Sequence, residues 1–184
     1  MRQNQELLMA SLVRFYRDPE RISAILPIIR GSSPTPLRLY NWFVTNYCKE
    51  NNVIIKKTIA HGESYLNVYI SYRTQLKTYS KAQFDPFRRD ERKRIIFNYD
   101  PDNPEKSIET TVGQLNFFKW TIESGILDYI MANKDRLERE MRASAITATA
   151  SSAATKPPDI AADEEAATAP SMTTREYTTV VTFD

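Results

Sequence analysis

The sequence predicts an α+β domain followed by a long C-terminal arm. Apolar residues recur at helical spacing through the first fifty positions, and several segments in the middle of the chain alternate apolar and polar residues as strands do. From residue 143 onward the composition changes to Ala, Thr, Ser, Pro and acidic residues. We therefore expect a compact domain over residues 1–142, with a small antiparallel sheet of about three strands covered by helices, and an extended low-complexity arm over residues 143–184.

Three helices are expected at the start of the chain. Leu8, Leu12 and Phe15 mark one apolar face of a helix over residues 4–16. The triplet that begins at Asp18 predicts the start of a second helix. Asp is a favoured N-cap residue, Pro19 lacks an N–H where the first turn of a helix leaves that group unpaired, and the negative charge of Glu20 is favourable near the positive end of the helix dipole. The Gly31–Pro36 segment ends that helix. A third apolar stripe predicts a helix from Leu37 to about Asn51.

The middle of the chain changes to strand periodicity. Strands are expected over residues 53–59, 65–73 and 95–99, with a hairpin turn at residues 60–63. In the second strand Leu66, Val68, Ile70 and Tyr72 fall on one face, which we expect to pack against the third helix and against Phe118 and Ile122.

Two more helices are expected before the arm. Thr111 and Gln114 have the spacing of a capping box, and the apolar positions that follow predict a helix ending at Ser124-Gly125. A last helix is expected to run from Ile126 into the charged segment that ends at Arg142. The intervening loop at residues 79–89 contains aromatic residues, of which Phe84 and Phe87 are expected to anchor it to the core.

The composition bears on the redox compartment of the protein, on membrane insertion and on the charge of its partners. A single cysteine, Cys48, excludes an intrachain disulfide and fits a thiol-reducing compartment. No apolar stretch approaches the ~18 residues of a membrane span, so we expect no transmembrane segment. Residues 143–184 carry two basic and six acidic side chains, whereas residues 1–142 have a net charge of +6. The basic domain is therefore suited to an acidic partner, or to its own acidic arm.

Candidate catalytic groups are scarce. His61 is the only histidine and stands in a predicted turn without a nameable nucleophile or orienting partner. Cys48 lies on a predicted helix face and is interpreted as a buried apolar group. One Cys and one His cannot complete a zinc site, and the four glycines are too scattered for a phosphate-binding loop. We expect no enzyme and no cofactor, with a viral enzyme of unrecognised type as the remote alternative.

The densest charge cluster is the basic segment of residues 88–94. Its candidate partner-binding residues are Arg88, Arg89, Arg92, Lys93 and Arg94. One interpretation is a solvated loop with internal ion pairs, because Asp90 and Glu91 interrupt the cluster. The others are a protein contact, or a nucleic-acid contact in which the basic groups follow the phosphates and nearby aromatics stack on bases.

The end of the arm has strand character. Residues 177–183 are β-branched or aromatic, with Tyr, Thr, Val and Phe on one face of a strand and Thr, Val and Thr on the other. The candidate binding residues are Tyr177, Val180, Val181 and Phe183. Such a peptide can add as a strand to an exposed sheet edge, of another protein or of this one. The segment before it is too poor in large apolar residues to fold alone, and it would act as a tether.

Several strings in the sequence resemble a protein family of the nucleocytoplasmic large DNA viruses, most closely its algal chlorovirus members. The strings are Tyr40–Tyr47, Tyr65–Arg88, Thr110–Trp120 and Ile126–Ile130, and the most specific part joins Leu-Lys-Thr-Tyr-Ser-Lys (76–81) to Phe-Asp-Pro-Phe (84–87). The resemblance covers about residues 10–132. It implies a virion protein made in the host cytoplasm, with no catalytic or ligand residues to transfer.

The resemblance implies a minor capsid protein of a large icosahedral DNA virus. Its expected partners are capsomers of the major capsid protein and other minor capsid proteins beneath the outer shell, close to an inner viral membrane. The alternative is a nucleic-acid-binding or transcription-associated virion protein that uses residues 88–94.

Overall fold

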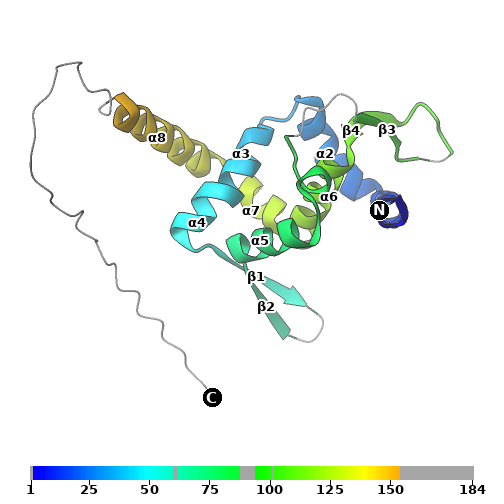
Figure 1. Ribbon diagram of the computed structural model, residues 1–184, viewed down its shortest axis with the longest axis horizontal. Coiled ribbons are helices and arrows are strands. Elements are labelled where there is room, and N and C mark those ends of the chain that lie inside the picture. Colours follow the sequence, from blue (N-terminus) through cyan, green and yellow to red (C-terminus); the bar gives the residue numbers. More distant parts are fainter. Residues whose placement is uncertain (1, 60–61, 88–93, 101, 154–184) are drawn as a thin grey trace, which may run out of the picture.

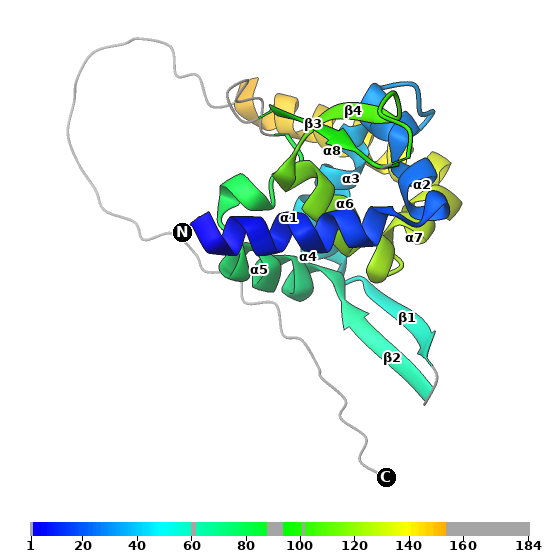
Figure 2. The same ribbon diagram turned by 90° about the vertical axis from the view of Figure 1, so that its right-hand side faces the viewer.

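Helix α6 (Val112–Glu123) is the centre of the fold. The computed structural model describes residues 2–59, 62–87, 94–100 and 102–153. Within them, α6 is buried on almost every side, as expected for a helix surrounded by others (Figures 1 and 2). Its start is capped as predicted, since the Thr111 hydroxyl accepts a hydrogen bond from the Gln114 backbone N–H at 3.1 Å. The Gln114 side chain contacts the Thr110 hydroxyl at 2.8 Å, so the return half of the capping box is not formed.

The first two predicted helices are confirmed. Helix α1 (Arg2–Tyr16) crosses α6, and the buried Tyr16 hydroxyl donates a 2.7 Å hydrogen bond to the Leu115 carbonyl. Helix α2 (Pro19–Arg30) begins with the Asp18 side chain accepting from the Glu20 N–H, and it ends at Gly31 with a positive φ of 74°. The left-handed conformation at this position favours glycine.

The third predicted helix is confirmed in extent but is not uniform. It comprises α3 (Leu37–Trp42), a π-helical turn η1 (Phe43–Tyr47) and α4 (Cys48–Asn51), and it ends at Asn52 with φ of 47°. The wide turn of η1 places Phe43, Val44 and Tyr47 in the core. Its residue spacing differs little from that of an α-helix, so the sequence did not reveal it.

A hairpin of β1 (Ile54–Ile59) and β2 (Gly62–Asn67) projects from the helical body (Figure 1). The strands are antiparallel, with register from Ile54 opposite Asn67 to Ile59 opposite Gly62. The first strand is therefore where the sequence predicts it. Residues 60 and 61 of the predicted turn, including His61, lie outside the described residues.

The predicted strand over residues 65–73 is wrong beyond Asn67. Helix α5 (Val68–Thr78) begins there, because the Asn67 side chain accepts a hydrogen bond from the Ile70 N–H at 3.0 Å and caps the helix. Val68 is fully buried and Tyr72 packs on Trp120 and Phe84, whereas Ile70 is 63% exposed. The predicted apolar strand face therefore does not exist.

The predicted three-stranded sheet is also corrected. Strand β3 (Arg94–Asn98) pairs with β4 (Ser107–Thr111), which the sequence analysis missed, and the two hairpins form separate two-stranded sheets. In β4, Ile108 and Thr110 face the core while Glu109 faces solvent. The α+β class is confirmed, but its sheet content is two small hairpins attached to a helical body.

The loop after α5 is anchored as predicted. It contains the short 3-10 helix η2 (Lys81–Gln83), followed by Phe84, which is fully buried. The Phe84 ring stacks on Tyr79 at a centroid distance of 6.0 Å and packs against Phe117 and Trp120. Phe87 is only partly buried. Phe84 therefore ties the loop to α6, together with the Asn116 side chain, which donates a 3.0 Å hydrogen bond to the Gln83 carbonyl.

The last predicted helix is divided at Asn133. Helix α7 (Ile126–Ala132) is followed by α8 (Lys134–Ala153), which continues eleven residues beyond the predicted domain boundary at residue 142. Residues 143–153 are thus helical rather than extended, in keeping with the high helix propensity of their alanines. The rest of the predicted arm, residues 154–184, lies outside the described residues.

Candidate partner-binding surface

Helix α8 leaves the helical body partway along its length. Leu137 and Met141 pack against the core, and α8 contacts α3 and α7. The side chains of residues 142–147 are all exposed, including Ile146 at 71%. Figure 1 shows the C-terminal half of α8 extending away from the other helices. At a helical rise of about 1.5 Å per residue, residues 142–153 form a stalk of about 18 Å that carries the chain away from the domain.

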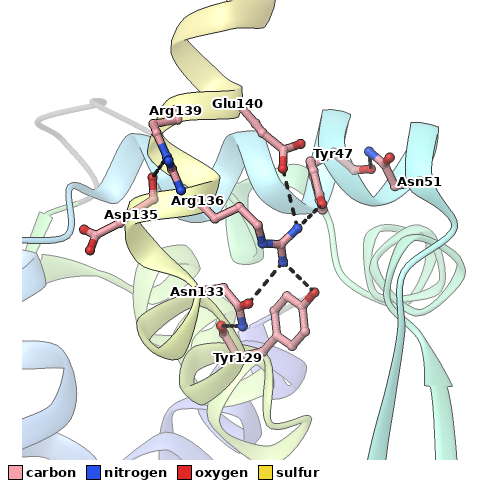
Figure 3. Close-up of polar contacts among 8 residues, drawn as sticks. All are labelled: Tyr47, Asn51, Tyr129, Asn133, Asp135, Arg136, Arg139 and Glu140. Carbon is pink, nitrogen blue, oxygen red and sulfur yellow. Dashed lines mark hydrogen bonds and ion pairs between the residues drawn. The ribbon is translucent and has the colours of Figure 1, made fainter.

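Arg136 holds the base of this stalk to the body (Figure 3). Its guanidinium donates hydrogen bonds to the hydroxyls of Tyr47 at 2.7 Å and Tyr129 at 3.2 Å, and to the Asn133 side-chain oxygen at 3.1 Å. Glu140 completes the group with an ion pair at 3.5 Å. Hydrogen bonding to Tyr129, followed by Tyr47, raises the pKa of Arg136 above its ordinary value. One side chain therefore connects η1, α7 and α8.

Arg94 is the only member of the predicted basic cluster within the described residues. It begins β3 and pairs with Glu109 of β4 at 3.0 Å, with about half of each side chain exposed. This pair lies at a cavity of about 450 Å³ between the end of α2, the following loop, β4 and the start of α6. The lining also includes Ile28, Thr35, Phe87 and Gln114. Phe87 and Arg94, the described residues on either side of residues 88–93, therefore both line this cavity.

The hairpins expose large apolar side chains. Ile54 and Tyr65 of the first hairpin are 54% and 64% exposed, and Ile96 of the second hairpin is 72% exposed. Around Tyr65 a small polar network forms, in which its hydroxyl donates to Glu63 at 2.7 Å and Lys56 pairs with the same carboxylate. An aromatic ring bordered by charged groups is typical of a protein-binding surface.

Cys48 has the properties expected of a structural residue. It is 1% exposed, and burial raises the pKa of its thiol to about 12. The thiolate needed for nucleophilic attack or metal binding is therefore disfavoured. The described part of the chain contains no group of three or more His, Cys, Asp or Glu side chains that could bind a metal ion.

Of the nine candidate binding residues predicted from the sequence, the described ranges contain Arg94 alone. Arg88, Arg89, Arg92 and Lys93 lie outside the described residues, as do Tyr177, Val180, Val181 and Phe183. The role of Arg136 is not visible in the sequence, because its partners come from η1 and α7 and a single arginine in a charged segment gives no sign of them. The first hairpin was predicted, but not that it projects from the body, because the strand pattern of β2 continues without interruption into α5.

Comparison with known proteins identifies the family. The chain matches the family model described as "Family of unknown function (DUF7197)" over residues 1–176. It belongs to this family. The DUF7197 chain is also 37% identical over 133 residues to "Uncharacterized protein L507" of Acanthamoeba polyphaga mimivirus. The aligned part is 70% of the present chain and 49% of the relative, so the chain spans about half the length of that protein. No solved structure matches.

These relationships support the broader part of the sequence-based resemblance. A giant-virus relative indicates that this DUF7197 member is a protein of a nucleocytoplasmic large DNA virus, made in the infected host. The closer link to algal chloroviruses and the capsid role stay predictions. No helix within the described ranges is long and apolar enough to cross a lipid bilayer.

Proposed function

We propose that this protein is a structural minor capsid protein that connects capsomers and other minor capsid proteins beneath the outer shell of a large icosahedral DNA virus. The observation that carries the proposal is the course of α8. This helix is held to the body by Leu137, Met141 and Arg136 and then continues as an exposed stalk into a chemically different segment. A domain with such an extension can contact a neighbour that its own surface does not reach.

The chemistry of the arm supports a linking role. Residues 154–184 carry two basic and six acidic side chains and end in the strand-like peptide of residues 177–183. Tethered weak contacts along one chain add to give strong attachment, because each contact raises the local concentration of the next. The basic segment of residues 88–94 would then contact acidic surfaces on the undersides of capsomers. The proposal assigns no catalytic role to the chain.

Incorporation into particles tests the proposal directly. A chain that ends at Ala153 keeps all of α8, so its domain should remain folded. We expect its incorporation into virions to fall at least about tenfold relative to the full chain, as loss of a tethered contact predicts. Normal incorporation of the shortened chain would overturn the arm-based linking role. Thermal unfolding of both chains provides the control for folding.

Protease protection gives a second, independent measurement. Glu164 and Glu165 provide cleavage sites for a Glu-specific protease in the part of the arm that precedes the terminal peptide. We expect rapid cleavage in the isolated protein and protection in intact particles, because an arm bound between capsomers is sterically shielded. Equal, rapid cleavage in both would indicate an arm that has no part in assembly.

The second candidate function is nucleic-acid binding by the basic segment. It is favoured by the dense positive charge of residues 88–94. Replacing Arg88, Arg89, Arg92 and Lys93 with Gln, while retaining the Arg94–Glu109 ion pair, tests it without disturbing the β3–β4 hairpin. Salt-dependent DNA binding that is lost in this variant would support this function. Salt-independent or absent binding would count against it.

A further inference from the structure

We infer that the free edge of β1 binds the chain's own terminal peptide, residues 177–183, as a third strand. The inference goes beyond the proposed function, because it requires no capsid component. The occupant is a named segment of this chain, and it is supported by the incompleteness of the β1–β2 hairpin, the hydrogen-bonding geometry of its edge, its charge and the length of the tether.

The β1–β2 hairpin is an incomplete sheet. In the described part of the chain no other strand pairs with β1 or β2. The first four residues of β2 are exposed on both faces, and only its last two are partly buried. A two-stranded hairpin is marginally stable on its own, and a third strand is the usual remedy. The six residues of β1 match the seven of the peptide in length.

The register shows which backbone groups are free at the β1 edge. The Val68 N–H donates to the Val53 carbonyl at 3.1 Å, so these opposed residues form a hydrogen-bonded pair. Hydrogen-bonded and non-hydrogen-bonded pairs alternate along an antiparallel ladder, so Ile55 and Leu66 form the next hydrogen-bonded pair between β1 and β2. The backbone N–H and C=O groups of Ile54, Lys56 and Thr58 therefore point away from β2, toward the free edge. Their N–H and C=O groups are the ones that a third strand would bind.

The apolar pattern of the peptide fits this edge. Ile54 and Tyr65 lie on one face of the hairpin, since Ile54 is opposite Asn67 and Tyr65 is two residues from Asn67. Both are more than half exposed. In an added strand, Tyr177, Val181 and Phe183 fall on a single face and can extend this apolar surface.

Charge favours the β1 edge over the β2 edge. Strand β1 carries Lys56 and Lys57, whereas β2 carries Glu63. The peptide is preceded by Glu176 and followed by Asp184, so its ends are acidic. Opposite charges on neighbouring strands are favourable and like charges are not. The Lys57 ammonium group also donates a hydrogen bond to the Glu123 backbone carbonyl, and this bond holds β1 against the end of α6.

The tether is long enough for binding within one chain. Residues 154–176 separate the end of α8 from the peptide. At ~3.3 Å per residue they span up to about 75 Å, which exceeds the ~40 Å expected across a domain of this size. A flexible tether of this kind gives an effective concentration on the order of millimolar, so a weak strand addition suffices.

Residue-level hydrogen exchange of the full chain tests the inference. We expect the amides of Ile54, Lys56, Thr58 and alternate residues of the peptide 177–183 to exchange at least about tenfold more slowly than unstructured amides, independent of protein concentration. Val180→Pro combined with Val181→Pro removes adjacent N–H groups, which point to opposite sides of a strand, so one of them faces β1 in either strand direction. The double variant should abolish protection at both places. Thr168→Pro, in the tether, is the matched control and should leave both protected.

The reciprocal variant is Lys56→Pro. Its missing N–H points away from β2, so the ladder amides of Ile55 and Lys57 should stay protected while the peptide becomes exposed. Lys56→Gln removes the ion pair with Glu63 but keeps the N–H, and it should retain peptide binding. Unprotected peptide amides in the natural chain would overturn the inference. Edge protection that survives the combined Val180→Pro and Val181→Pro substitutions, or that increases with protein concentration, would also overturn binding of the chain's own peptide.

Discussion

Arg136 and Tyr47 are 89 positions apart in the sequence, and the arginine Nη1 donates a 2.7 Å hydrogen bond to the tyrosine hydroxyl. The guanidinium also lies over the Tyr47 ring, 5.9 Å from its centroid. Tyr47 in turn stacks on Phe43 of the core at 5.6 Å. The base of α8 is thus connected through one aromatic residue to the π-helical turn (Figure 3).

Arg136→Met should weaken the attachment of α8. Methionine keeps part of the apolar stem but cannot donate to Tyr47, Tyr129 or Asn133. The Arg136 side chain is 41% exposed, so we expect a loss of about 1–2 kcal/mol in the free energy of unfolding rather than the value for a buried charge. Urea denaturation measures it. Arg139→Met is the matched control, because within the described part of the chain Arg139 bonds only to the Asp135 carbonyl of its own helix. An equal loss there would contradict the special role of Arg136.

The packing of α8 predicts a second contrast, between two apolar side chains of the same helix. Leu137 is fully buried and Ile146 is 71% exposed. Leu137→Ala should therefore lower the free energy of unfolding by about 2–4 kcal/mol through lost burial and a new cavity. Ile146→Ala should change it by less than about 0.5 kcal/mol. Similar effects in chemical denaturation would mean that the distal part of α8 also packs against the body.

The helices and their caps were predictable because their signals are local. Asp18 and Thr111 cap the helices that the sequence places after them, and Phe84 anchors its loop as its aromatic spacing indicates. The error at α5 arose from two periodicities in one segment. Val68 and Tyr72 are compatible with both a strand face and a helix face, and the cap at Asn67 decides for the helix.

Pairing between distant segments was not predictable. Strand β4 was missed because its buried positions include Thr110, which does not mark an apolar strand face, and its partner lies beyond the turn at residues 100–106. The sequence also did not show that β3 pairs with β4 rather than with β1 or β2. Of the candidate site, it identified the basic segment and the arm by composition, but not Arg136 or the exposed edge of β1, because both depend on tertiary geometry.

Gly113→Ala tests the contact between α6 and the loop anchored by Phe84. An added Cβ would lie 3.0 Å from the backbone oxygens of Ala82 and Asp85 and 3.1 Å from the Asp85 nitrogen. Alanine normally favours a helix by up to about 1 kcal/mol over glycine. These contacts are backbone atoms that cannot move aside easily, so we expect net destabilisation of about 1–3 kcal/mol. Stabilisation in thermal or urea denaturation would mean that the loop is not packed as the structure describes.

Burial of Cys48 predicts a loss of stability in alkaline solution. Burial raises the pKa of this thiol to about 12, whereas the thiol of an unfolded chain titrates near about 8.5. Between these values the unfolded state releases a proton that the folded state retains. The contribution of Cys48 to stability is therefore complete below about pH 8 and declines as the pH rises toward 12.

The effect can be isolated by comparing the natural chain with Cys48→Ala. Between pH 7.5 and 9.5 we expect the natural chain to lose about 1.3 kcal/mol more of its free energy of unfolding than the variant does. The cavity left by alanine lowers stability equally at both pH values and cancels in this comparison. Burial also raises the pKa of Tyr40 to about 12, but a tyrosine in the unfolded chain titrates only at ~10. Tyr40 therefore adds little to the pH dependence of stability below pH 9.5, and it adds the same amount in both proteins. Parallel pH profiles in urea denaturation would show that the Cys48 thiol is accessible to solvent, and a nucleophilic role for it would have to be considered again.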